Sequence, residues 1–80
     1  MFARASDVLW RLGGDRVVAR RIGGESVDLL GPTALVWMAL DSPRASTELR
    51  HELAEFGLGP EVIEVAIDEL LRFELVRRLG

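Results

Sequence analysis

The sequence lacks cysteine altogether and contains a single histidine, His51. The absence of cysteine excludes a disulfide scaffold, a thiolate zinc site and a cysteine nucleophile. One histidine among glutamates provides too few ligands for a metal centre, so we interpret His51 as part of a solvated helix face. The sequence also lacks a signal-peptide pattern and any run approaching the roughly 18 apolar residues that cross a bilayer. We therefore expect a cytoplasmic protein with no metal, no cofactor and no membrane contact.

The length and the charge favour a small binding module. The 80 residues suffice for a single domain, which we place at residues 1–80. A domain this small buries only roughly 60% of its unfolded surface, which leaves little room for a deep catalytic pocket. The net charge of −3 disfavours binding to phosphate backbones. No nucleophile–base pair can be assembled from the residues, so we expect no enzymatic activity.

The front half of the chain has the pattern of three short strands. The runs Val8–Leu12, Arg16–Ile22 and Glu25–Leu30 are separated by Gly13-Gly14 and Gly23-Gly24. Glycine pairs adopt positive φ at low cost and suit tight hairpin turns. The pattern predicts an antiparallel meander whose third strand is left as an edge.

Side-chain alternation differs between these runs. In the third run, Val27 and Leu29 point one way, whereas Ser26, Asp28 and Leu30 point the other way. The second run alternates less cleanly, which predicts a β-bulge within it.

From Gly31 onward the apolar spacing becomes helical. Pro32 suits a first helical turn, and the segment 33–40 is apolar enough to be buried nearly all round. A second helix, capped by Ser46 or Thr47, is expected to end at Gly57, and a third begins at 59–61. The run 75–79 is either a short strand or a docked extension. The expected inner faces comprise Leu49, Leu53 and Phe56 on the second helix, and Ile63, Ala66, Ile67, Leu70 and Leu71 on the third.

This order of elements predicts an α+β domain with a three-stranded antiparallel meander followed by three helices. The order resembles a winged-helix topology with its sheet moved to the front. A winged helix that reads nucleic acid needs a basic recognition helix, but the third helix is predominantly acidic. Its acidic residues are Glu61, Glu64, Asp68 and Glu69, against a lone Arg72. The arginines of the first two strands either line a solvent-facing sheet or attract an acidic peptide; they are Arg11, Arg16, Arg20 and Arg21.

Several stretches taken together match the pattern of a known family. They are Val27-Asp28-Leu29-Leu30-Gly31-Pro32-Thr33-Ala34, Leu35-Val36-Trp37-Met38-Ala39-Leu40-Asp41, Glu48-Leu49, 63–71 and Leu75-Val76. With these stretches, segment 26–76 resembles the PqqD-like domain, also called the RiPP recognition element. RiPPs are ribosomally synthesised and post-translationally modified peptides. No single stretch is diagnostic, and the resemblance rests on their combination with the length and the element order.

The chain departs from the usual family pattern at three turn positions. Gly31 replaces the usual Asn, and Ser42 stands where Gly often follows the Asp. Glu74 stands where Gly often precedes the final Leu-Val. These departures affect turn geometry and lie outside the residues expected to bind a peptide.

The resemblance implies a peptide-binding function. Domains of this family capture the leader segment of a precursor peptide as an extra strand beside the third strand, in a cleft against the third helix. They then deliver the precursor to a modifying enzyme. Free-standing versions work with a leader peptidase in lasso-peptide pathways, and versions in cofactor pathways such as PQQ biosynthesis work with a radical-SAM enzyme. An exposed edge strand, with its unpaired N–H and C=O groups, fits such strand addition.

The expected peptide site combines the third strand with surplus apolar residues of the third helix. Its residues are Glu25, Ser26, Val27, Asp28, Leu29, Leu30, Val62, Val65, Ala66, Glu69 and Phe73. Glu69 is expected to recognise a basic or hydroxyl group of the leader. For Val62, Val65 and Phe73, burial in the core is an equal alternative. Proline at position 27 or 29 is expected to abolish binding, because proline removes a backbone donor or distorts the strand.

Two functions of other classes remain open. A winged-helix nucleic-acid binder would lose affinity steeply with salt. A dimerising module would pair its edge strand with that of a second copy, in a concentration-dependent manner and without peptide affinity.

Overall fold

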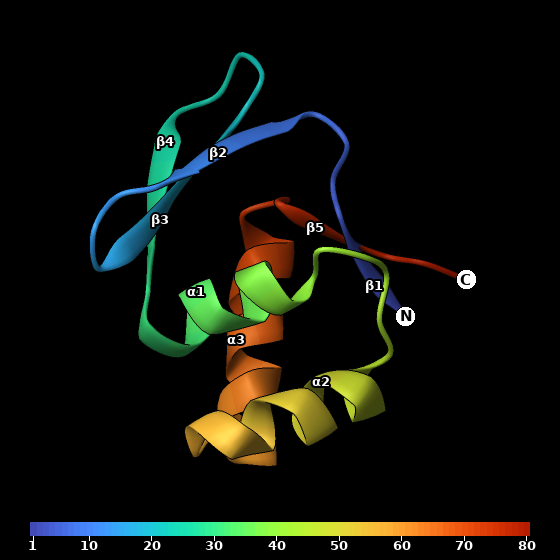
Figure 1. The fold of residues 1–80 in the computed structure, drawn as a ribbon. Coiled ribbons are helices and arrows are strands. Elements are labelled where there is room, and N and C mark those ends of the chain that lie inside the picture. Colours follow the sequence, from blue (N-terminus) through green and yellow to red (C-terminus); the bar gives the residue numbers. More distant parts are fainter.

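The computed structural model describes residues 1–80 and contains two small sheets and three helices (Figure 1). The elements are β1 (Phe2–Arg4), β2 (Val8–Leu12), β3 (Arg16–Arg21), β4 (Ser26–Leu30), α1 (Gly31–Ala39), α2 (Ser46–Leu53), a 3₁₀ turn η1 (Ala54–Phe56), α3 (Pro60–Arg72) and β5 (Val76–Arg78). This order confirms the predicted α+β class, with a meander followed by three helices. None of the helices combines the length and the apolar character that a membrane crossing requires.

The meander has the strand order β2-β3-β4, with β4 at one edge. On one side of β3, the pairing with β2 runs without interruption from Val8↔Arg21 to Leu12↔Val17. On the other side, the pairing with β4 runs without interruption from Arg16↔Leu30 to Arg20↔Ser26. The predicted bulge in β3 was therefore wrong. The irregular pattern arises because Val18, an apolar residue, lies on the outer face of the sheet between two inward-facing neighbours.

A second sheet joins the two ends of the chain. β1 pairs antiparallel with β5, and Phe2 lies opposite Arg78. The tail is thus a short strand, one of its two predicted forms. The sequence did not predict β1, because a three-residue strand is too short to show an alternating pattern.

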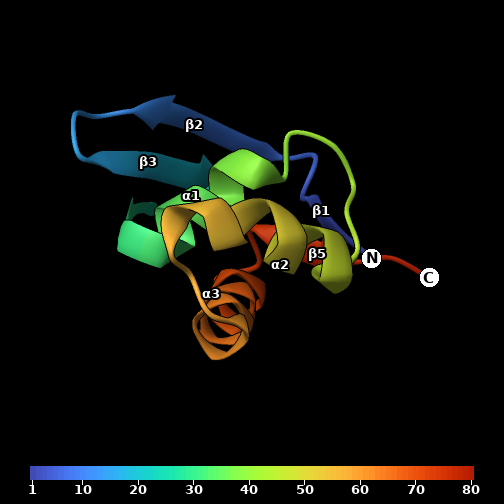
Figure 2. The same cartoon turned by 60° about the horizontal axis from the view of Figure 1, so that its bottom comes forward.

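The core lies between the meander and the helices, which form two layers in Figures 1 and 2. α1 occupies the centre, because it packs on β3 and β4 on one side and on α2 and α3 on the other. The buried core residues include Val17, Ala19 and Leu29 from the sheet, and Val36, Trp37, Leu49, Ile63, Ile67 and Leu70 from the helices. Burial of each large aliphatic side chain contributes about 1.5–3 kcal/mol.

Arg4 connects the N-terminal strand to this core. Its guanidinium carbon lies 4.7 Å from the ring centroids of both Trp10 and Trp37. The same group donates a 2.8 Å hydrogen bond to the Trp37 carbonyl, which belongs to the last turn of α1. Burial lowers the pKa of Arg4. Arg4 therefore supplies a second donor to the Trp37 carbonyl, which otherwise accepts only from the Leu40 N–H at 3.1 Å at the end of α1.

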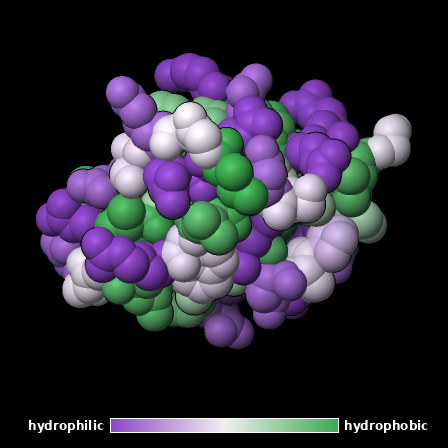
Figure 3. Space-filling model, turned by 90° about the horizontal axis from the view of Figure 1, so that it is seen from above, coloured by the Kyte–Doolittle hydropathy of each residue, from purple (hydrophilic) through white to green (hydrophobic).

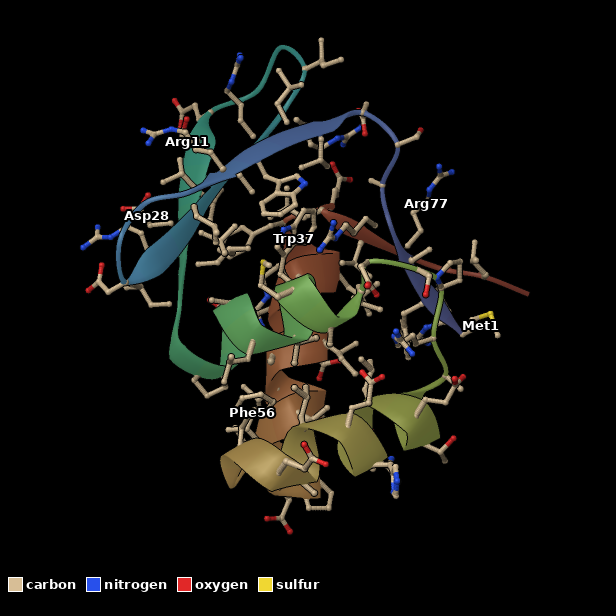
Figure 4. All side chains as sticks on the ribbon, in the orientation of Figure 1. Met1, Arg11, Asp28, Trp37, Phe56 and Arg77 are labelled. Atoms are coloured by element: carbon tan, nitrogen blue, oxygen red, sulfur yellow. The ribbon has the colours of Figure 1, made fainter.

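Two details of α2 differ from the sequence prediction. Ala45, not Ser46 or Thr47, is the N-cap, and its N–H donates to the Glu48 carboxylate at 3.0 Å. Phe56 is not on an inner face: it is 63% exposed and is labelled in Figure 4. After α2 the chain tightens into η1, and the shorter turn of a 3₁₀ helix rotates Phe56 away from the face that the α-helical spacing predicted.

Two of the three departures from the family pattern lie at left-handed backbone positions. Gly31, the first residue of α1, has φ = 56°, and Glu74, between α3 and β5, has φ = 60°. Asn and Gly, the usual family residues there, both tolerate this conformation. Glu74 adopts it at a cost of about 1–2 kcal/mol, and its carboxylate forms an ion pair with Arg21.

Candidate functional site

The β2–β3 hairpin determines which backbone groups of the sheet are free. The N–H of Gly13 donates to the Arg16 carbonyl at 2.8 Å. The backbone groups of Arg16 therefore point toward β2. In the central strand of an antiparallel sheet, successive residues bond to opposite neighbours. Val17 and Ala19 therefore bond toward β4.

This alternation continues into β4 and leaves one set of its backbone groups unpaired. Val17 and Ala19 lie opposite Leu29 and Val27, so the N–H and C=O groups of these two β4 residues point toward β3. The N–H and C=O groups of Ser26 and Asp28 consequently point away from β3. The edge of β4 is thus a template for one more strand.

A cavity of about 380 Å³ lies between α1 and α3, where β4 ends and α1 begins. We call it the α1–α3 cavity, and it is lined by Pro32, Thr33, Glu61, Val62, Val65, Ala66 and Glu69. Val62 and Val65 are 42% and 66% exposed, so neither belongs to the core. The cavity therefore has apolar walls that remain open to solvent.

Glu69 has a fixed position in this cavity. The Thr33 hydroxyl donates a 3.0 Å hydrogen bond to one Glu69 carboxylate oxygen. No arginine lies within ion-pair distance of Glu69, whereas Glu64 on the same helix pairs with Arg50 at 2.8 Å. The cavity lining contains two carboxylates, Glu61 and Glu69, and no cationic side chain. It is therefore both apolar and negatively charged.

A second cavity, of about 430 Å³, lies at the other end of β4 beside the β3–β4 turn. This hairpin cavity is lined by Arg21, Ile22, Gly23, Gly24, Glu25, Val27, Phe73, Glu74 and Leu75. Its residues come from the turn and from the C-terminal end of α3. The two cavities thus lie at opposite ends of the free edge.

One ion-pair cluster lies at the hairpin cavity, since its members Arg21 and Glu74 belong to the lining. Arg21 donates to a carboxylate oxygen of Asp7 at 2.9 Å and to one of Glu74 at 2.6 Å. The hydrogen bond from Arg21 lowers the pKa of Asp7. The same hydrogen bond raises the pKa of Arg21. The charge of Arg21 is consequently neutralised within the domain.

The structure places the predicted site residues in three settings. Val62, Val65, Ala66 and Glu69 share the α1–α3 cavity, and Glu25, Val27 and Phe73 share the hairpin cavity. The side chains of Ser26, Asp28 and Leu30 are exposed, on the opposite face of the sheet from the buried Leu29. Ser26, Asp28 and Leu30 therefore offer backbone groups at the free edge of β4, which together with the two cavities we call the groove. Their side chains form no part of either cavity wall.

Sequence reasoning missed three residues of the α1–α3 cavity, namely Pro32, Thr33 and Glu61. The sequence pattern places Thr33 only within an apolar helix. Its position in the first turn of α1 makes its hydroxyl available to a neighbouring helix, but the packing of α1 on α3 is not visible in a periodic pattern. A polar residue inside an apolar helix was the available signal.

The outer face of the meander carries Arg11, Arg16 and Arg20, whereas Arg21, the fourth arginine of the first two predicted strands, lines the hairpin cavity. Arg16 pairs with Asp15 and Asp28 at 3.1 and 3.0 Å, while Arg11 and Arg20 form no ion pair. In Figure 4 Arg11 and Asp28 lie on the side of the sheet away from the helices. Seen from above, small hydrophobic areas alternate with hydrophilic side chains (Figure 3). Only Arg16 is thus neutralised by acidic partners, whereas Arg11 and Arg20 line one hollow that contains no acidic residue.

The site offers main-chain donors and acceptors, apolar walls and carboxylates. No group of three histidine, aspartate or glutamate side chains is placed to hold a metal ion. His51 is exposed on α2. The chemistry that this arrangement supports is the binding of an extended chain.

Comparison with known proteins identifies the fold. No protein-family model matches the sequence, and no curated protein matches it. A solved structure of TbiB1 in complex with the TbiA(beta) leader peptide superposes with a TM-score of 0.78 at 17% sequence identity, covering 98% of each chain. The chain therefore has the fold of a RiPP recognition element, the PqqD-like fold that the sequence predicted.

Proposed function

We propose that this chain binds the leader segment of a ribosomally synthesised precursor peptide by strand addition to β4. The observation that carries the proposal is the free edge of β4, with a cavity at each of its ends. The outward backbone groups at Ser26 and Asp28 supply hydrogen bonds to any extended chain, and the cavities select side chains. The shared fold with TbiB1, which was solved with a leader peptide, supports the same role here.

The domain acts as an adaptor and leaves the reaction to a second protein. Its groove holds a peptide in extended form, which keeps the segment following the leader accessible to an enzyme. The partner is a maturation enzyme, such as a leader peptidase in a lasso-peptide pathway or a radical-SAM enzyme. We place this complex in the cytoplasm, where precursor peptides are made.

The same edge also offers the competing arrangement, because β4 of one copy can pair with β4 of another. A homodimer of this kind would occupy the template strand and exclude a peptide. Nucleic-acid binding is disfavoured by the acidic side chains of α3, of which Glu61 and Glu69 line the groove. Peptide titration at two protein concentrations distinguishes peptide binding from homodimerisation, and titration at two salt concentrations distinguishes it from nucleic-acid binding.

The proposal is tested by calorimetric titration of the full chain with leader segments of precursor peptides encoded beside its gene. We expect saturable binding to one leader, retained at moderate salt, and no binding to a scrambled peptide of the same composition. Absence of binding to every leader by the folded domain contradicts the proposal. A concentration-dependent dimer in sedimentation would then assign the edge to self-association.

A further inference from the structure

The α1–α3 cavity has a composition that a purely apolar ligand does not match. Its apolar wall is formed by Val62, Val65 and Ala66, and Glu69 stands at one side of this wall. The Glu69 carboxylate accepts one hydrogen bond from a side chain, that of Thr33. A carboxylate can accept about four hydrogen bonds, so water must donate most of those that Glu69 accepts.

A bound peptide that covers this cavity removes that solvent. Loss of water around a carboxylate is costly unless the ligand supplies a donor or a positive charge. The chain itself supplies no cation here, because none of the lining residues is basic and no salt bridge involves Glu69 or Glu61. The compensating charge must therefore come from the peptide.

We infer that the α1–α3 cavity binds a lysine or arginine side chain of the bound peptide. The methylene stem of such a residue packs on Val62, Val65 and Ala66, as long basic side chains do on apolar surfaces. The charged end then reaches Glu69, which the Thr33 hydroxyl holds in place, with Glu61 as a second carboxylate at the lining. This inference rests on the proposed peptide binding and specifies one position of the ligand.

The two ends of the groove differ in a way that gives the bound peptide a direction. In the hairpin cavity Glu74 is already paired with Arg21, and Phe73 and Val27 supply apolar wall. Glu25 is a further carboxylate there, but the hairpin cavity contains a cation, whereas the α1–α3 cavity has two carboxylates and no basic side chain. A peptide with a basic residue at one end of its bound segment and an apolar residue at the other end fits in one orientation only.

The test is a selection from a displayed library of random dodecapeptides on the immobilised full chain, run in parallel on two variants. Glu69→Gln removes the charge and keeps an oxygen that accepts from Thr33. Asp68→Asn, the control, makes the same charge change at an exposed neighbour outside the cavity. The best peptide is then measured by fluorescence anisotropy beside an analogue in which norleucine replaces its basic residue.

We expect the wild-type chain and Asp68→Asn to select peptides with lysine or arginine at one fixed position, and Glu69→Gln to lose this preference. The norleucine analogue should bind the wild type about tenfold or more weakly, because a charge-assisted hydrogen bond is lost, and Glu69→Gln should bind both peptides alike. Selected peptides without a basic position, or a preference that Glu69→Gln retains, overturn this inference alone. Failure to select any peptide overturns peptide binding itself and this inference with it.

Discussion

The hydroxyl of Thr33 and a carboxylate oxygen of Glu69 lie 3.0 Å apart and are hydrogen-bonded. The bond joins the first turn of α1 to the third turn of α3. Because α1 starts at the residue after β4, it also fixes the end of the template strand relative to the opposite wall of the groove. This contact therefore links the free edge of β4 to the α1–α3 cavity.

Replacement of Asp28 by proline is expected to abolish peptide binding without unfolding the domain. The Asp28 N–H points away from β3, and proline is tolerated on the free side of an edge strand. Asp28→Ala is the matched control, because it removes the exposed pair with Arg16 but keeps the N–H. Calorimetry measures binding, and circular dichroism checks the fold. Full binding by Asp28→Pro would exclude β4 as the template.

Proline at Val27 or Leu29 is expected to unfold the domain as well as to abolish peptide binding. Their N–H groups point toward β3, so proline there disrupts the meander itself. We expect Leu29→Pro to lose binding together with its cooperative thermal unfolding. A folded Leu29→Pro would contradict the assigned ladder.

Replacement of Val65 by aspartate is expected to remove peptide affinity at little cost in stability. Val65 is exposed in the free domain, so the change costs less than about 1 kcal/mol. In the complex the change would remove the apolar wall on which the methylene stem packs, and it would bury a third carboxylate in a cavity whose ligand supplies one positive charge. Leu70→Ala provides the contrast, because this fully buried residue should cost about 2–5 kcal/mol. Urea unfolding and peptide titration of both variants measure the two effects, and unchanged affinity in Val65→Asp would place the peptide elsewhere.

Replacement of Glu74 by glycine should stabilise the domain relative to Glu74→Ala by about 1 kcal/mol, because only glycine relieves the left-handed strain. Both variants lose the exposed pair with Arg21, so that loss cancels in the comparison. Urea midpoints of the two variants measure the difference. Equal midpoints would show that position 74 is unstrained.

The Asp7–Arg21 pair should stabilise the domain in a pH-dependent way. The hydrogen bond from Arg21 lowers the pKa of Asp7 in the folded state, below the unfolded value of about 3.9. Its contribution is therefore present above that value and is lost as the pH falls through the folded pKa. The free energy of unfolding of the wild type should exceed that of Asp7→Asn near neutral pH, and the difference should shrink in acid. A difference that stays constant with pH would contradict the pairing.

The fold was largely predictable because its signals are local. Glycine pairs mark the hairpins of the meander, and strict alternation in Ser26–Leu30 predicts the edge strand that the structure contains. Helical spacing predicts the buried Ile63 and Leu70. Two of the failures, β1 and Phe56, involve a three-residue strand and a 3₁₀ turn, which are both too short to carry a period.

The site was predictable on α3 and less so elsewhere. The surplus of apolar residues on one helix pointed to Val62, Val65 and Ala66, which share one cavity with Glu69. Thr33 was missed because its role depends on how α1 packs against α3, a long-range relationship. The side chains of Ser26, Asp28 and Leu30 were grouped with the groove by strand position, although the pleat turns them to the outer face.

Amide hydrogen exchange, resolved by residue in the presence and absence of a bound leader peptide, tests the central claim most directly. Without peptide, the Val27 and Leu29 amides should be protected by β3, whereas the Ser26 and Asp28 amides exchange freely. With peptide, the Ser26 and Asp28 amides should become protected as well, because strand addition pairs them. A bound peptide that leaves these two amides exchanging at their free rates would contradict strand addition to β4.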